Sequence, residues 1–191
     1  MSCCVGRSAG RPAEPGLLGV RTGKDILGRQ SIVSARWKEG YVNIQGMAHV
    51  NVNCSDFDRS RAFYERLGFE VVWEVEPVGS PAISAAVGMP PYRVKGAVMA
   101  LGGNPRSTAI DLLEWQDPED GEAPYPHLYH LGLARVALFT SDMDADVQQL
   151  REAGVEFVSE PVSLAGPTGE TVRFVCFKDP DGTVLELVSA G

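Results

Sequence analysis

The sequence predicts an α+β protein built from two βαβββ modules of the same kind. The first observation is an internal repeat: residues 46–72 align with residues 132–158 without a gap, and nine of the 27 aligned positions are identical. The second is that each copy passes from an alternating strand into a capped helix. The third is that strand-like segments follow each helix. Self-similarity at a fixed offset is typical of a duplicated structural unit, so the two halves are expected to share one fold.

Each copy opens with a short strand. In "GMAHVNVN" (46–53), valines alternate with polar residues, so apolar and polar side chains are expected on opposite faces of a sheet. His49 begins the polar face of this strand. In the second copy, "GLARVALF" (132–139), Arg135 takes the position of His49. The same strand pattern therefore occurs twice in the chain, with a different ionisable residue at one matched position.

A helix follows each of these strands. "SDFD" and "SDMD" predict the two helix N-termini, with Ser55 and Ser141 as the N-caps and an acidic residue three positions later. Gly68 and Gly154 stand where a residue in the left-handed conformation ends each helix. Both helices are thus predicted with matched beginnings and matched ends.

The rest of each half is predicted to form strands separated by turns. "GGNP" and "KDPDG" carry Pro and Gly at favoured turn positions. Pro81 predicts a short additional helix within residues 80–91. The strands are expected at residues 69–75, 92–101 and 107–115 in the first half and at 155–159, 170–177 and 183–188 in the second.

These elements divide the chain into a tail, residues 1–44, and one domain, residues 45–190. Within the domain, module one covers residues 45–115, a linker covers 116–131, and module two covers 132–190. The tail is rich in Gly, Pro, Ser and Arg and has little periodicity, so we expect it to be disordered or loosely attached.

Charge is distributed unevenly between the tail and the domain. Residues 1–45 hold seven of the 17 Lys and Arg residues and three of the 25 Asp and Glu residues, so the remainder holds ten basic and 22 acidic residues, a formal net charge of −12. Contacts to phosphates require clustered Lys and Arg. An acidic domain therefore argues against nucleic acid as a partner.

The composition also argues against a membrane protein. No run of apolar residues approaches the roughly 20 that span a bilayer, and no secretory signal pattern is seen at the start. Four cysteines are present without a C-x-x-C or C-x-x-H spacing, which argues against zinc-finger and redox motifs. Sparse, unpaired cysteines suit a reducing compartment, so a cytoplasmic location is expected.

Two acidic residues interrupt strands that are otherwise apolar. Asp111 lies within "AIDLL" and Glu186 within "VLELV", in the last strand of each half. An ionised carboxylate in such a strand costs several kcal/mol unless another group compensates it. Because both occupy matched positions of the repeat, one shared cause is expected for the two, together with His49 and Arg135 on the first strands.

The sequence resembles the vicinal oxygen chelate superfamily, also called the glyoxalase/bleomycin resistance/dioxygenase proteins, over roughly residues 45–190. The resemblance rests on "HVNVNCSDFDRSRAFYERLGF", "ARVALFTSDMDADVQQLREAGVEF" and "FKDPDGTVLELV". It implies two paired βαβββ modules that form a cupped, barrel-like mixed sheet around a cavity. Metal-using members bind a divalent ion there through the first and last strands of each module. Those positions correspond here to His49, Asp111, Arg135 and Glu186.

Two interpretations of this site remain open. In the first, His49, Asp111 and Glu186 hold one divalent ion, with Mn, Fe, Zn, Ni and Mg as candidates for a set of one imidazole and two carboxylates. In the second, Arg135 replaces the metal and neutralises the carboxylates, which leaves a metal-free pocket. Arginine has no lone pair to offer a metal, and its fixed charge repels a divalent ion, so we favour the second.

Structural roles are the alternative for these residues. His49 is then a hydrogen-bonded strand histidine, and the two carboxylates pair with Arg135 as a structural network. His127 and His130 are interpreted as linker residues that pack beside tyrosines. In the alternative interpretation, His130 turns toward the cavity and replaces a missing metal ligand. Glu114 is expected on the outer surface, on the strand face opposite to Asp111.

The resemblance implies two classes of function. With a metal, it implies lyase, isomerase or dioxygenase chemistry on a small oxygenated organic molecule, with Glu186 as ligand and base and Arg135 holding a substrate carboxylate or enolate. Without a metal, it implies a binding or sequestering protein of the bleomycin-resistance type, whose acidic domain suits a cationic or aromatic ligand. Family members commonly dimerise, so a homodimer is expected.

Overall fold

The chain divides into two compact units, residues 1–46 and residues 47–191. A computed structural model describes residues 22–24, 30–32, 46–125, 127–166 and 169–190. In the first unit it describes two short antiparallel strands, β1 (Thr22–Lys24) and β2 (Gln30–Ile32). The rest of the predicted tail lies outside the described residues.

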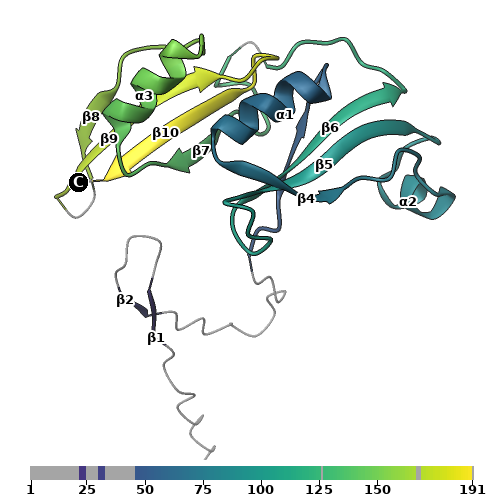
Figure 1. The fold of residues 1–191 in the computed structure, drawn as a ribbon, viewed down its shortest axis with the longest axis horizontal. Helices are drawn as coiled ribbons and strands as arrows, with labels where there is room; N and C mark the ends of the chain where they lie inside the picture. Colours follow the sequence, from purple (N-terminus) through teal and green to yellow (C-terminus); the bar gives the residue numbers. More distant parts are fainter. Residues whose placement is uncertain (1–21, 25–29, 33–45, 126, 167–168, 191) are drawn as a thin grey trace, which may run out of the picture. The chain divides into compact units, whose positions relative to one another are not determined.

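The second unit contains two four-stranded mixed sheets, one from each module (Figure 1). Sheet one has the strand order β3-β6-β5-β4, and sheet two has the order β7-β10-β9-β8. In both, the first strand of the module pairs in parallel with the last, and the other pairs are antiparallel. The predicted α+β fold of two βαβββ modules is therefore confirmed.

The element bounds follow the repeat. Module one contains β3 (Val50–Asn53), α1 (Phe57–Arg66), β4 (Phe69–Glu74), α2 (Pro81–Ala86), β5 (Arg93–Leu101) and β6 (Ala109–Asp117). Module two contains β7 (Val136–Phe139), α3 (Met143–Glu152), β8 (Val162–Ala165), β9 (Thr171–Lys178) and β10 (Val184–Ala190). None of the helices in these described parts of the chain is long and apolar enough to cross a membrane.

The helix ends are partly as predicted. Gly68 and Gly154 follow the C-caps of α1 and α3 with φ angles of +88° and +81°, a conformation that favours glycine. The N-caps are Asp56 and Asp142, each accepting a hydrogen bond from a backbone N–H three residues later, so the predicted serine caps were wrong by one residue. Aspartate is as good an N-cap as serine, and the sequence "SD" does not distinguish them.

One predicted strand was displaced. Residues 155–159 form no strand, and only Phe157 makes an isolated bridge, to Phe177. β8 begins after Pro161, at Val162. Proline has no N–H to donate to a strand ladder, and regular pairing begins only after Pro161. Before Pro161, the chain packs the ring of Phe157 against the core. The ring centroids of Phe157 and Phe177 are 5.6 Å apart.

A single apolar core joins the two modules. Both long helices lie on the same side of the sheets (Figure 1) and contribute to it. Phe63 of α1 illustrates the shared packing, because its ring lies 6.4 Å from that of Phe177 on β9. Buried residues of this core come from both sheets, including Leu112, Val175, Leu185 and Leu187.

The turn between β9 and β10 is tied to α1 by polar contacts. The hydroxyl of Tyr64 donates a 3.0 Å hydrogen bond to Asp179, and Arg59 forms a 2.6 Å ion pair with Asp181. Burial raises the pKa of Asp179, since the charged carboxylate is removed from water. Burial alone would also raise the pKa of Asp181, but hydrogen bonds from Ser55 and the charge of Arg59 hold it below its ordinary value. These contacts hold α1 of module one against the β9–β10 turn of module two, and we refer to them as the clasp.

Replacing Tyr64 with Phe should destabilise the fold, because it removes a buried hydrogen bond to a carboxylate. We expect a loss of about 1–2 kcal/mol and a fall in Tm of roughly 3–7 °C, measured by thermal unfolding. Tyr92→Phe is the matched control, since Tyr92 is also buried and its hydroxyl makes no hydrogen bond among the described residues. Equal Tm values for Tyr64→Phe and the parent would contradict a role for this clasp.

Candidate functional site

Each sheet has one face packed on the core and one face turned away from α1 and α3, which we call the open face. On β10, Leu185 and Leu187 belong to the core, so Glu186 between them points to the open face of sheet two. On β6, Ile110 and Leu112 belong to the core, so Asp111 points to the open face of sheet one. Both acidic residues therefore lie on the side of the sheets opposite to the long helices.

The strand register shows that these two positions are equivalent. Asp111 lies beside Asn51 on the neighbouring first strand, and Glu186 lies beside Ala137. Asn51 and Ala137 are themselves matched residues of the repeat, each two positions after His49 or Arg135. The duplicated strands thus place a carboxylate at the same point of each module.

In module two the carboxylate has two partners. Glu186 Oε2 lies 3.2 Å from Arg135 Nη1, and the thiol of Cys176 on β9 donates to the same oxygen over 3.6 Å. Arg135 Nη1 also approaches Cys176 Sγ, at 4.0 Å. Burial raises the pKa of the Cys176 thiol, and Glu186 adds to the rise while Arg135 opposes it. The thiol is therefore a neutral donor at ordinary pH, and the ion pair is the charged centre of this half.

In module one the carboxylate is less well satisfied. Asp111 Oδ1 is buried and has no hydrogen-bond partner among the described residues. Burial raises the pKa of Asp111, and the nearby charge of His49 opposes that rise. Two carboxamides line the same face: Asn51 donates to the backbone oxygen of Asp111 at 2.9 Å, and Asn53 accepts from the indole N–H of Trp115 at 2.9 Å.

The structure divides the predicted site residues into two pairs, His49 with Asp111 and Arg135 with Glu186. Among the residues described in the second unit, no group of three or more His, Cys, Asp or Glu side chains lies close enough to hold a metal ion. In a single chain, His49, Asp111 and Glu186 therefore do not fit a resident divalent ion. The metal site of His49, Asp111 and Glu186 stays a prediction.

Some functional contacts were missed or misjudged at the sequence level. Cys176 lies opposite Glu186 in the ladder, and the alternation of β9 between two core residues would have placed it on the open face. Glu114 does lie on the strand face opposite to that of Asp111, as predicted, but its side chain is half-buried rather than on the outer surface. Its carboxylate accepts a 2.7 Å hydrogen bond from the N–H of Phe57, the first residue of α1, where a negative charge also complements the helix dipole.

The linker histidines pack against tyrosines, as predicted. His127 stacks on Tyr129 with ring centroids 4.7 Å apart, and His130 stacks on Tyr125 at 4.3 Å. The alternative role of His130 as a ligand stays a prediction. This stacking explains why the linker carries two histidines without requiring a chemical role for either.

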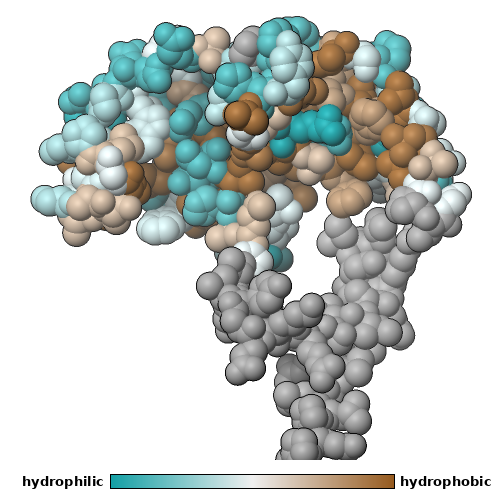
Figure 2. Space-filling view, turned by 180° about the vertical axis from the view of Figure 1, so that it is seen from behind, coloured by the Kyte–Doolittle hydropathy of each residue, from teal (hydrophilic) through white to brown (hydrophobic). Residues whose placement is uncertain are grey.

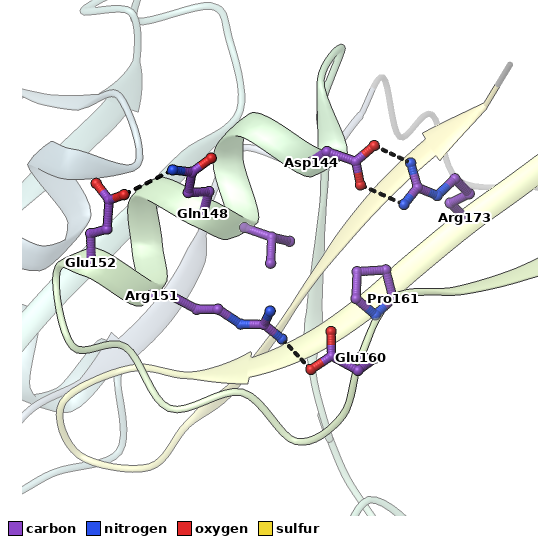
Figure 3. Close-up of a pocket in the computed structure, with 8 residues that line it drawn as sticks. Asp144, Gln148, Arg151, Glu152, Glu160, Pro161 and Arg173 are labelled. Atoms are coloured by element: carbon purple, nitrogen blue, oxygen red, sulfur yellow. Dashed lines mark hydrogen bonds and ion pairs between the residues drawn. The ribbon is translucent and has the colours of Figure 1, made fainter.

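A pocket of about 460 Å³ lies away from both pairs, between α3, residues 160–161 just before β8, and Arg173 of β9 (Figure 3). Two ion pairs border it: Asp144 with Arg173 at 2.6 Å, and Arg151 with Glu160 at 2.7 Å. Its charged side chains are thus mostly paired with one another, and the pocket lies on the helix side of sheet two. We therefore place the candidate site on the open faces rather than here.

The open faces also carry apolar surface. Hydrophobic side chains reach the solvent over a broad part of the second unit (Figure 2). On sheet one, Tyr92, Val94 and Leu113 are buried and form a small cluster separate from the main core. On sheet two, Phe139 and Val162 are exposed. A molecule bound at the open face of sheet two would contact both a polar pair and an apolar surface.

Comparisons with known proteins agree with this architecture. The family model of the Glyoxalase/Bleomycin resistance protein/Dioxygenase superfamily matches residues 46–187. The Bacillus subtilis protein YwkD is 33% identical over 147 residues, which cover 75% of this chain and 96% of that protein. A glyoxalase family protein from Bacillus cereus has a TM-score of 0.67 at 20% identity, covering 80% of this chain and 99% of that one. The trypanothione-dependent glyoxalase I of Leishmania major has a TM-score of 0.52 at 23% identity, covering 76% and 87%.

The Arg135–Glu186 pair should show measurable energetic coupling. Arg135→Gln leaves the buried Glu186 without its cation, and we expect a loss of about 1–2 kcal/mol, discounted because the arginine itself is partly exposed. The double variant Arg135→Gln/Glu186→Gln should lose less than the sum of the single variants, by about 1 kcal/mol. Chemical denaturation of the four proteins measures this cycle.

The same cycle on Arg151 and Glu160 provides the control, because that pair lies near the surface and should show little coupling. Strictly additive losses at Arg135 and Glu186 would mean that the ion pair contributes nothing to the fold.

Proposed function

The chain belongs to the glyoxalase/bleomycin resistance protein/dioxygenase superfamily, and on that basis we propose that it binds a small oxygenated organic molecule against the open faces of its sheets. Superfamily membership supports a small-molecule ligand, although it does not determine the chemistry. The two polar pairs, each set in an apolar sheet face, are the groups that would orient such a molecule.

One observation carries the proposal that binding in module two is independent of a metal. Arg135 lies at 3.2 Å from Glu186, where a metal would otherwise use that carboxylate. A guanidinium offers no lone pair, and it already neutralises the acid. Its permanent charge also repels a divalent ion nearby. The protein would then act as a binding or sequestering protein, with Arg135 in place of the metal.

A second candidate, a metal-dependent lyase, isomerase or dioxygenase, is supported by module one. Asp111 Oδ1 is buried near His49 and has no hydrogen-bond partner in the part of the chain that the structure describes, as expected for a metal-ligand atom without its metal. Glu186 from a second copy would have to complete the set in a homodimer. Such a metal, when bound, would act as a Lewis acid toward substrate oxygens. Arg135 would then hold a substrate carboxylate or enolate, and Glu186 is the candidate base.

A cytoplasmic location is part of the proposal. Cys54 and Cys176 are buried free thiols, and they are separate in the fold. Proteins of oxidising compartments commonly use such residues in disulfides. Two unpaired thiols on interior strands and turns therefore support a reducing environment.

Arg135→His should separate the two candidates. The substitution removes the fixed charge and adds an imidazole at the position that matches His49 in the repeat. If Arg135 excludes metal, the variant should bind Mn²⁺, Zn²⁺ or Ni²⁺ at least tenfold more tightly than the parent, about 1.4 kcal/mol. Calorimetric titration measures the affinities, with light scattering at the same concentration to report whether a dimer is present.

Glu186→Gln in the Arg135→His background is the control, and it should abolish the gain. Tight metal binding by the parent protein would instead favour the metal-dependent candidate. It would mean that Arg135 does not block the site in the assembled protein.

A further inference from the structure

We propose that the ligand of module two is an amphipathic organic carboxylate. Its anionic end would bind the outward side of Arg135, and its apolar body would lie along the open face of sheet two. This inference rests on the proposed function and names the class of molecule that the site selects. Three features of sheet two carry it: the orientation of one ion pair, an apolar row across all four strands, and the spacing between them.

The first feature is that Arg135 is the outer member of its ion pair. Its side chain is 44% exposed, whereas that of Glu186 is 9% exposed. Three other ion pairs of module two are arranged the opposite way, with acidic partners that are 67–78% exposed and bases that are 34–42% exposed. Those pairs present negative charge to the solvent. At Arg135 the protein presents positive charge, with the carboxylate behind it.

The contact with Glu186 is made through Nη1, the same nitrogen that approaches Cys176. A guanidinium carries five N–H donors in a planar fork, and a carboxylate can accept two of them side by side. The remaining donors of an exposed arginine are therefore suited to a ligand carboxylate. Glu186 holds the fork from behind and fixes its orientation.

The second feature is a continuous apolar row on the same face. Strand register places Phe139 of β7 beside Val188 of β10, Val188 beside Phe174 of β9, and Phe174 beside Val162 of β8. Phe139 is 59% exposed and Val162 is 45% exposed. Module two has no counterpart of α2 among its described elements, so no helix of its own covers this row. Two aromatic rings and two branched side chains form a surface for an apolar ligand.

The third feature is the distance between the polar pair and the row. Glu186 and Val188 are two residues apart on one strand, a separation of about 7 Å at the usual rise per residue. A second apolar row, with Val172 and Leu164 paired, lies two residues further along, roughly 13 Å from Glu186. A ligand that uses both features needs its apolar body within about this length of its carboxylate.

Charge narrows the class further. The part of the chain after residue 45 has a formal net charge of −12, which repels polyanions such as nucleic acids and nucleotides. A monoanion is repelled less strongly than a polyanion by the acidic domain, and it gains the local contact with Arg135. The acidic domain suits a cationic or aromatic ligand, but the exposed guanidinium makes a cation unfavourable at this position. A single carboxylate on an apolar body satisfies both constraints.

The test uses three probes with the same apolar body: 4-phenylbutyrate, 4-phenylbutan-1-ol and 4-phenylbutylamine. Calorimetry on the full-length protein should give an affinity for the carboxylate at least tenfold higher than for the alcohol or the amine. Methyl NMR locates the binding. Signals of Val162, Leu164 and Val188 should shift with 4-phenylbutyrate, whereas those of Val147, in the pocket beside α3, should not.

Two variants and one control complete the design. Arg135→Gln should weaken 4-phenylbutyrate binding at least tenfold and leave the alcohol unchanged. Phe139→Ser should weaken all three probes, and it is exposed enough to preserve the fold. Arg173→Gln is the matched control, because Arg173 lies on the same sheet but on its helix side, paired with Asp144. It should bind all three probes as the parent does.

The outcomes separate this inference from the proposed function. Equal binding of the acid and the alcohol, or preference for the amine, would overturn the carboxylate class while leaving small-molecule binding intact. Binding of 4-phenylbutyrate that shifts only Val147 would place the ligand in the pocket beside α3 and overturn the inference. Failure of all three probes in a protein that light scattering shows to be a dimer would overturn it, with a second copy as the candidate occupant of the face. Failure of all three with a monomer would count against the proposed function as well.

Discussion

The alternation of side chains along the last strand of each module is the constraint on which the site depends. Leu185 and Leu187 enter the core on either side of Glu186, and a shift of register by one residue would expose both leucines. The cost of exposing them, several kcal/mol by area, far exceeds the cost of keeping one compensated carboxylate on the open face. The position of Glu186 is thus determined by its apolar neighbours, and Asp111 is placed in the same way by Ile110 and Leu112.

The contacts described above between the modules lie on the helix side of the sheets. Phe63 meets Phe177 in the shared core, and Tyr64 reaches the turn at Asp179. Neither α1 nor α3 contributes a side chain to the open faces through these contacts. The main core and these contacts between the modules therefore lie on the same side of the sheets.

Periodicity explains why much of the architecture could be predicted from the sequence. The gap-free repeat identified both modules, and Gly68 and Gly154 identified the helix ends because only a left-handed residue fits there. The sequence could not locate the start of the strand after Pro161 or the N-caps at Asp56 and Asp142. In each case, neighbouring residues fitted the same strand or capping pattern equally well. The division of the site into two pairs was also beyond reach. Alternation determines which face a residue occupies, but the separation between two sheets depends on how their cores pack.

The two modules have kept one scaffold and diverged in charge. In module one the first-strand residue is an imidazole, whose nitrogens can form hydrogen bonds or bind a metal, and the acid beside it keeps a buried oxygen with no hydrogen-bond partner among the described residues. In module two the matched residue is a guanidinium, which is permanently charged and already paired with its acid. The first arrangement leaves one oxygen of the acid unpaired among the described residues, and the second neutralises the acid with a fixed positive charge. The strand register places a carboxylate at the same point of each sheet, Asp111 in one and Glu186 in the other. Because the first strands carry His49 in one copy and Arg135 in the other, the same scaffold holds two different polar pairs.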